Sequence, residues 1–257
     1  MPQAVETYIK TKSFKEVDLI KRDILNLYKD DIVKYSGDDS IKVQSIFEEI
    51  PSQLQKHEKR FSFNSMQKDA RYRDYKDAFF WLQESMIVNI AFNTTEPNIG
   101  LRLNRESSAL KCYMGDTGLL LSLAFDEKGL VDEEIYRKIL FNKLTFNEGM
   151  IMENIVAKML VASGHKLYFY NNPSRDDKQN SANNMEIDFL IAKNKITSKH
   201  NISPIEVKSG NYRSHASLDK FRTKFASKIG NAYILYTKDV MEKDGILHLP
   251  VYMAMFL

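Results

Sequence analysis

Two stretches of sequence decide the fold of the second half of the chain: EIDFLI at residues 186–191 and PIEVK at residues 204–208. Both predict β-strands, because they are short and mostly apolar and contain β-branched residues. Alternate residues of a strand share one face, so Glu206 and Lys208 point to the same side while their neighbours enter the core. If Asp188 lies opposite, two carboxylates and an ammonium group converge at one edge of a sheet.

The elements on either side of these strands predict an α/β domain. The sequence patterns indicate a helix at 148–163, strands at 166–170, 186–192 and 202–208, a helix at 217–228 and a strand at 232–236. This order is typical of helices packed around a mixed sheet. The polar stretch at 171–184, between two of the strands, predicts a loop.

The acidic residues at this edge suit a hard divalent cation. Carboxylates bind Mg²⁺ or Mn²⁺, and such an ion polarises a phosphoryl oxygen and lowers the pKa of a bound water. Lys208 can position that water and offset developing negative charge. Glu153, on the helix before the strands, can add a third carboxylate. The alternative is an ion pair that only caps the edge of the sheet.

This pattern resembles the PD-(D/E)XK nuclease-like superfamily. The core of that superfamily has the order α-β-β-β-α-β, with an acid on the first helix, an Asp on the second strand and E-x-K on the third. The resemblance covers about residues 148–236, and Ile187 stands where the motif usually has proline. It implies the catalytic residues Glu153, Asp188, Glu206 and Lys208, and a metal ion held by Asp188, Glu206 and the carbonyl group of Val207.

The first half of the sequence predicts helices followed by a small hairpin. Helical segments are expected at 13–35, 40–50, 65–70, 72–86 and 116–125, with a break or kink at Pro51, and short strands at 61–63, 87–92, 102–103 and 110–113. Helices followed by a hairpin suggest a winged-helix module. Residues 53–76 include seven basic and three acidic residues, a composition that fits DNA binding or a solvated face.

A change in charge predicts two domains. Residues 1–130 carry 19 basic and 20 acidic residues, whereas residues 131–257 carry 18 and 14. With an acidic linker at 126–134, we expect a helical, winged-helix-like domain at 1–130 and a PD-(D/E)XK nuclease-like domain at 131–257. Residues 193–228 hold nine basic residues against two acidic ones, which predicts either a surface that faces nucleic-acid phosphates or a solvated face.

The composition excludes several classes of protein. The 257 residues are 43% hydrophobic and 28% charged, as in ordinary globular domains. The single cysteine, Cys112, excludes a disulfide framework and a Cys-based zinc site. No apolar run approaches the ~18 residues of a membrane span, and charged residues interrupt any signal-peptide core. We therefore expect a cytoplasmic protein without a membrane partner.

Nearly the whole chain is similar to the C-terminal region of a bacterial and archaeal family of AAA-type P-loop ATPases, a region named only as a domain of unknown function. The matching segments are MPxAV at 1–5, LYxxDIxKY at 27–35, IPxxL at 50–54, WL at 81–82, KxYMxDTGLL at 111–120, EN at 153–154, EIDF at 186–189 and PIEVKSG at 204–210. The resemblance implies a preceding ATPase domain, then winged-helix-like and nuclease-like parts. No G-x-x-x-x-G-K-[ST] motif occurs here, so we expect no ATP site in these residues. We expect a fragment of a longer ATPase or the product of an internal start.

Three functions fit these observations. The first is a DNA-associated, nuclease-like module that uses Mg²⁺ or Mn²⁺. The second is a non-catalytic DNA- or protein-binding regulatory region of an ATPase, with a degenerate nuclease fold. The third is a platform for protein interactions, which predicts a large apolar patch.

Overall fold

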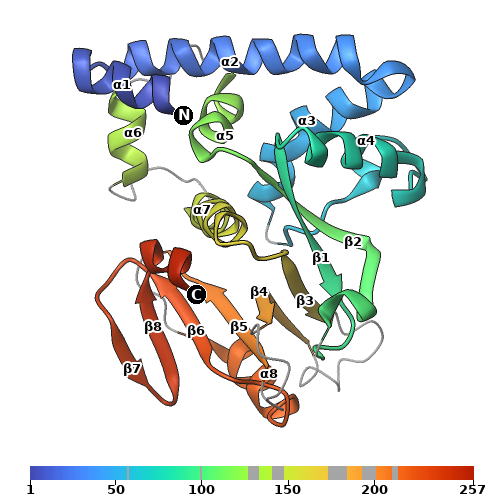
Figure 1. Ribbon diagram of the computed structural model, residues 1–257, viewed down its shortest axis with the longest axis vertical. Helices are drawn as coiled ribbons and strands as arrows, with labels where there is room; N and C mark the ends of the chain where they lie inside the picture. Colours follow the sequence, from blue (N-terminus) through green and yellow to red (C-terminus); the bar gives the residue numbers. More distant parts are fainter. Residues whose placement is uncertain are drawn as a thin grey trace. The chain divides into compact units, whose positions relative to one another are not determined.

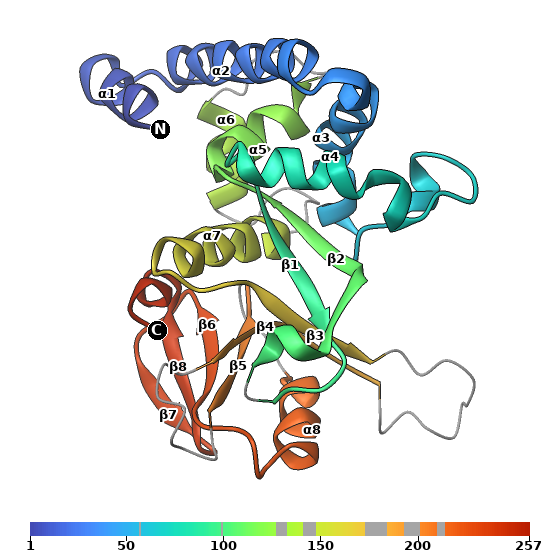
Figure 2. The same cartoon turned by 45° about the vertical axis from the view of Figure 1, so that its right-hand side comes forward.

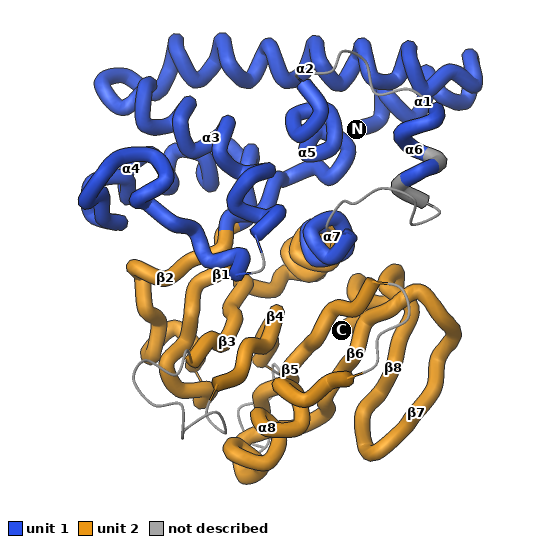
Figure 3. The backbone as a smooth tube through the Cα atoms, turned by 180° about the vertical axis from the view of Figure 1, so that it is seen from behind, with its two compact units in different colours: residues 1–89, 112–154 blue, residues 90–111, 155–257 orange. Residues whose placement is uncertain are grey.

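The computed structural model describes residues 1–56, 58–98, 100–126, 133–140, 148–172, 184–192, 201–209 and 214–257. Contacts within the chain divide it into two units. Unit 1 contains Met1–Asn89 and Cys112–Asn154, and unit 2 contains Ile90–Lys111 and Ile155–Leu257 (Figure 3). The expected linker at 126–134 and the expected loop at 171–184 lie largely outside the described residues.

Unit 1 is mainly helical. Its helices are α1 (Pro2–Thr11), α2 (Phe14–Tyr35), α3 (Ser40–Gln55), α4 (Tyr72–Glu84), α5 (Thr117–Ala124), α6 (Glu133–Leu140) and the first part of α7 (Glu148–Ala162) (Figure 1). Capping side chains explain two of the starting points. The Ser13 hydroxyl accepts a hydrogen bond from the Glu16 N–H, and the Asp116 carboxylate accepts from the N–H groups of Gly118 and Leu119. The predicted helices at 13–35, 72–86 and 116–125 are confirmed.

Three local predictions in unit 1 are wrong: the helix break at Pro51, the strand at 61–63 and the helix at 65–70. Pro51 does not end α3, which continues to Gln55, and the apolar side chains on either side of it are buried. Packing of that face therefore outweighs the helix-breaking tendency of proline. Residues 61–63 are not a strand, because Phe61 and Phe63 instead pack their rings against Phe79, with centroids 5.1 and 6.0 Å away. The helix expected at 65–70 is also absent, and a 3₁₀ turn occupies Phe63–Ser65.

The described strands of the chain form one eight-stranded mixed sheet. Its strands are β1 (Val88–Thr94), β2 (Arg105–Met114), β3 (Tyr168–Asn172), β4 (Met185–Ala192), β5 (Ile202–Val207), β6 (Ala232–Tyr236), β7 (Met241–Lys243) and β8 (Ile246–Pro250). They lie in the order β2-β1-β3-β4-β5-β6-β8-β7 (Figure 1, Figure 2). The β3–β4, β4–β5 and β7–β8 pairs are antiparallel, and the β1–β3, β5–β6 and β6–β8 pairs are parallel.

The element order predicted for the second half is present. Helix α7 is followed by β3, β4 and β5, then by α8 (Ala216–Lys224) and β6. The side chains of Leu218, Phe221 and Phe225 pack on the sheet against Tyr170 and Ile234, among others, and form a core that also includes Leu101. Strands β7 and β8 were not predicted, and the strand expected at 102–103 is a 3₁₀ turn at Leu101–Asn104.

The predicted hairpin consists of β1 and β2, and its setting differs from that of an isolated wing. On its other side β1 pairs with β3, so both strands belong to the large sheet. A helical N-terminal part followed by a mixed sheet is therefore the architecture of this chain. Across the described ranges, no helix combines the length and the apolar character needed to cross a membrane.

Candidate functional site

The predicted site lies where β4 and β5 stop pairing with each other. The ladder between these strands runs from Ala192–Ile202 to Phe189–Ile205. One residue farther along β4, the Asp188 Oδ2 atom accepts a hydrogen bond of 2.8 Å from the Val207 N–H. Beyond this point β4 continues along β3 and β5 continues along β6. The Asp188 carboxylate therefore occupies the point at which the two strands diverge.

A β-bulge in β4 explains how Asp188 reaches this position. Tyr168 pairs with Leu190 and Tyr170 pairs with Ile187, so two steps along β3 match three steps along β4. The extra residue falls at Asp188–Phe189. A bulge changes the direction of a side chain and interrupts the ladder, which frees the Asp188 carboxylate to bind the backbone of β5.

Lys111 on β2 is the site residue that sequence analysis missed. Its ammonium group is fully buried, lies 2.6 Å from Glu186 Oε1 and 3.9 Å from Asp188 Oδ1, and sits 5.0 Å from the centre of the Phe169 ring. Its local signal in the sequence is a lysine inside the apolar strand predicted at 110–113. A buried lysine requires a counter-ion, because an unpaired charge in the interior is costly.

Glu206 and Lys208 form the second ion pair of the site. They are two residues apart at the end of β5, and the Lys208 ammonium pairs with Glu206 Oε1. Burial raises the pKa of the Glu206 carboxyl, and the neighbouring Lys208 ammonium partly opposes that rise. Among the described residues, Glu206 Oε2 has no hydrogen-bond partner although it is buried.

This unpartnered oxygen is the feature of the site that fits a cation. Buried carboxylate oxygens normally accept a hydrogen bond or bind a cation. A divalent ion would supply the missing partner of Glu206 Oε2. The N–H and C=O of one strand residue point to the same side, so the Val207 carbonyl faces the β4 side, as its N–H does. Within the described ranges, there is no group of three or more His, Cys, Asp or Glu side chains that could hold a metal ion. The fit rests on Glu206, Asp188 and the backbone of Val207.

Glu153, the fourth predicted catalytic residue, belongs to unit 1, whereas Asp188, Glu206 and Lys208 belong to unit 2. Its buried carboxylate pairs with the Lys59 ammonium and accepts a hydrogen bond of 3.1 Å from the Tyr113 hydroxyl. Both oxygens of Glu153 thus have partners inside unit 1. Its role as an outer acid stays a prediction.

The side chain of the neighbouring Asn154 also has hydrogen-bond partners for both its oxygen and its nitrogen. Its side chain makes three hydrogen bonds, two with the backbone N–H and C=O of Met114, at 2.8 and 3.0 Å, and one to the Thr117 hydroxyl, at 2.9 Å. The Glu153-Asn154 pair therefore fixes the start of α7 to the end of β2 and to α5. This is a structural reason for two adjacent polar residues in the middle of a mostly apolar helix.

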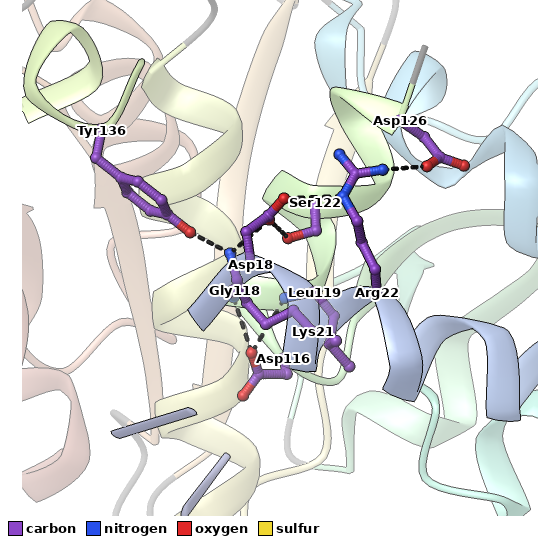
Figure 4. A network of polar contacts seen from close by, with 9 residues as sticks. All are labelled: Asp18, Lys21, Arg22, Asp116, Gly118, Leu119, Ser122, Asp126 and Tyr136. Atoms are coloured by element: carbon purple, nitrogen blue, oxygen red, sulfur yellow. Dashed lines mark hydrogen bonds and ion pairs between the residues drawn. The ribbon is translucent and has the colours of Figure 1, made fainter. Parts of the chain in front are cut away.

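Unit 1 holds a second buried polar network (Figure 4). Asp18 on α2 is fully buried, pairs with Lys21 and Arg22, and accepts a hydrogen bond of 2.5 Å from the Ser122 hydroxyl. Lys21 also donates to the Tyr136 hydroxyl. Burial lowers the pKa of Lys21, an effect that Asp18 opposes, and burial raises the pKa of Tyr136. These contacts connect α2 with α5 and α6.

The structure separates the predicted basic segments into exposed and buried parts. Of the basic residues at 53–76, Lys59 is buried against Glu153, and the others lie exposed on unit 1. In the segment 193–228, Lys220, Arg222 and Lys224 lie on α8, while Lys193, Lys195, Lys199 and Arg213 fall outside the described residues.

Comparison with known families places the chain in context. A family model described as a domain of unknown function, DUF8612, matches residues 1–129, which is half of the chain. The chain belongs to the DUF8612 family. In this DUF8612 protein a second domain of unknown function, DUF4143, matches residues 148–253. No curated protein and no solved structure matches the chain.

The two matches divide the candidate site between them. Lys111 comes from the stretch that matches DUF8612, and Asp188, Glu206 and Lys208 come from the stretch that matches DUF4143. All four nevertheless belong to unit 2. In this DUF8612 protein the site is thus built from both families.

Proposed function

We propose that this chain is the C-terminal region of an AAA-type ATPase and acts on DNA in the cytoplasm. The nuclease-like site lies where the ladder between β4 and β5 ends, and it hydrolyses phosphodiesters with Mg²⁺ or Mn²⁺. The observation that carries the proposal is the contact between the Asp188 carboxylate and the Val207 N–H, next to the buried Glu206. The order α7-β3-β4-β5-α8-β6, which matches the PD-(D/E)XK core, supports it.

In this proposal Asp188, Glu206 and the Val207 carbonyl hold the ion. The ion supplies Lewis-acid chemistry toward a phosphate oxygen. Lys208 positions the attacking water and balances negative charge that develops on the phosphate. Glu153 is the candidate outer acid. The basic residues of α8, of which Lys224 is exposed and Lys220 and Arg222 are half-buried, and the exposed basic residues of the segment before α4 contact the DNA backbone. The ATPase domain is the partner in the same protein.

The test is cleavage of labelled DNA substrates by the full chain with Mg²⁺ or Mn²⁺. The wild type should cleave, and both Asp188→Asn and Glu206→Gln should abolish cleavage without loss of fold. Glu242→Gln, an exposed change on β7, is the matched control and should leave cleavage unchanged. Cleavage that survives both site changes would contradict the assignment.

One observation favours a second candidate function, a non-catalytic DNA- or protein-binding regulatory module. The acidic groups of the site on β4 and β5 already have a lysine nearby, Lys111 for Glu186 and Asp188 and Lys208 for Glu206. In that case DNA binds without being cut, and its affinity falls as salt rises, because bound phosphates release counter-ions. Changing Lys220 and Lys224 together to Ala should weaken binding and flatten the slope of log K against log salt. Binding without cleavage at millimolar Mg²⁺ would favour this function over the first.

A further inference from the structure

Lys111 already acts as a cation for the carboxylates of β4. Its ammonium group lies 2.6 Å from Glu186 Oε1 and 3.9 Å from Asp188 Oδ1, and its side chain is 1% exposed. The Asp188 carboxylate therefore has a positive charge near one oxygen and the Val207 N–H on the other. A divalent ion at Asp188 has to share this carboxylate with Lys111.

The energetics make this competition strong. Charges a few ångströms apart interact far more strongly in the interior than in water, because the effective dielectric constant is lower. The ammonium group is held in place by the Glu186 carboxylate and by the face of the Phe169 ring, 5.0 Å away. Because the side chain is buried and held by both contacts, we expect Lys111 to stay in place and repel an ion at Asp188.

We propose that Lys111 is the built-in cation of this site, which competes with a divalent metal for Asp188 and sets how tightly the site holds metal. This inference rests on the proposed metal site, but its own prediction is a change in affinity with a definite sign. Loss of the lysine charge should tighten metal binding. A purely structural role for Lys111 predicts the reverse, because a disturbed site binds metal less well.

The experiment is titration of the full chain with MnCl₂ by isothermal calorimetry, with the fold checked by circular dichroism. Lys111→Met should bind Mn²⁺ at least tenfold more tightly than wild type, which corresponds to about 1.4 kcal/mol. Lys111→Arg keeps the charge and should stay close to wild type. Lys238→Met, an exposed change on the same unit, is the control and should have no effect.

A second pair of variants covers the case in which Lys111→Met does not fold. In Glu186→Gln the Lys111 ammonium has only the Asp188 carboxylate of β4 as a partner. Lys111 then competes more strongly for Asp188, so Mn²⁺ should bind more weakly than to wild type. The double variant Lys111→Met, Glu186→Gln removes both partners of the ion pair, which avoids an uncompensated buried charge. It should bind Mn²⁺ at least tenfold more tightly than Glu186→Gln alone.

The outcomes separate this inference from the proposed function. Tighter Mn²⁺ binding by the variant without the Lys111 charge supports the inference. Absence of Mn²⁺ binding by the wild type would overturn the proposed metal-dependent nuclease, but it would leave this inference standing if the variant binds. Unchanged or weaker binding by a folded variant overturns the inference, while Mn²⁺ binding by the wild type leaves the nuclease proposal standing. Absence of binding in every folded variant overturns both.

Discussion

Glu153 is a buried carboxylate with two partners of different kinds. The Lys59 ammonium balances its charge, and the Tyr113 hydroxyl donates a hydrogen bond to its second oxygen. Taking both charges out of water costs free energy that only close pairing offsets. Removal of one partner leaves the other buried without compensation, so the pair is a point where a small change has a large effect.

We therefore expect Glu153→Gln to lower the free energy of unfolding by about 3 to 5 kcal/mol, the usual cost of breaking a buried ion pair. Urea denaturation followed by the fluorescence of Trp81, the single tryptophan, measures the change within unit 1. Adding Lys59→Met should recover part of the loss, because the orphaned ammonium is then gone. Glu84→Gln, an exposed change at the end of α4, is the control. Equal stability of Glu153→Gln and wild type would show that the pair contributes nothing.

Helix α3 contains a proline, Pro51, in its interior. Pro51 has no N–H to donate to the Phe47 carbonyl, and its ring crowds that carbonyl. The helix persists because Phe47, Ile50 and Leu54 are fully buried along one face. Packing thus holds four further residues in helical form beyond the proline.

Pro51→Ala should consequently raise the free energy of unfolding, by about 1 to 3 kcal/mol, since it restores a hydrogen bond and removes the clash. Thermal and urea unfolding of the full chain measure the gain. The neighbouring Ser52→Ala, which changes an exposed side chain, should stay within about 0.5 kcal/mol of wild type. A loss of stability in Pro51→Ala would mean that the packing of α3 depends on the backbone conformation that proline imposes.

Elements with a clear hydrophobic period could be predicted from the sequence, and elements defined by their neighbours could not. The helix at 13–35 and the strands β4 and β5 follow from local pattern alone. The alternation of Phe61 and Phe63 predicts a strand, but the two rings pack on Phe79 instead. Strand β7 is three residues long and fully exposed, so only its pairing with β8 defines it.

For the candidate site too, local sequence pattern identified some residues, but it could not identify a residue that joins the site through the fold. Asp188, Glu206 and Lys208 were found from their spacing on two strands, and the structure places them at the end of the β4–β5 ladder. Lys111 is 77 residues before Asp188 in the sequence and meets it only through the sheet. No local pattern signals such a contact.

At the scale of the whole molecule, the sequence families and the units of the structure follow different boundaries. The boundaries between the units fall inside β1, β2 and α7, whereas the DUF8612 and DUF4143 matches are separate ranges of sequence. Unit 2 takes its strands at one edge of the sheet, and the core residue Leu101, from the DUF8612 part.

We expect a fragment of residues 131–257 to fail to fold cooperatively, because it lacks β1 and leaves β3 as an unpaired edge strand. Nuclear magnetic resonance spectra and a thermal melt of the fragment, compared with the full chain, measure this. Adding residues 1–130 as a separate chain should restore a folded species if the missing strands are the cause. A dispersed spectrum and a sharp transition for the fragment alone would contradict the expectation and support independent domains at the predicted boundary.

The pairing of β1 with β3 also has a consequence for synthesis on the ribosome. Phe92 and Tyr168, which are partners in this ladder, are 76 residues apart in the chain. At a translation rate of roughly 5–20 residues per second, β1 waits about 4 to 15 s for its partner. Throughout this interval the apolar edge of β1 is a template for pairing with other chains. We therefore expect nascent chains of this protein to be prone to aggregation between the emergence of β1 and that of β3.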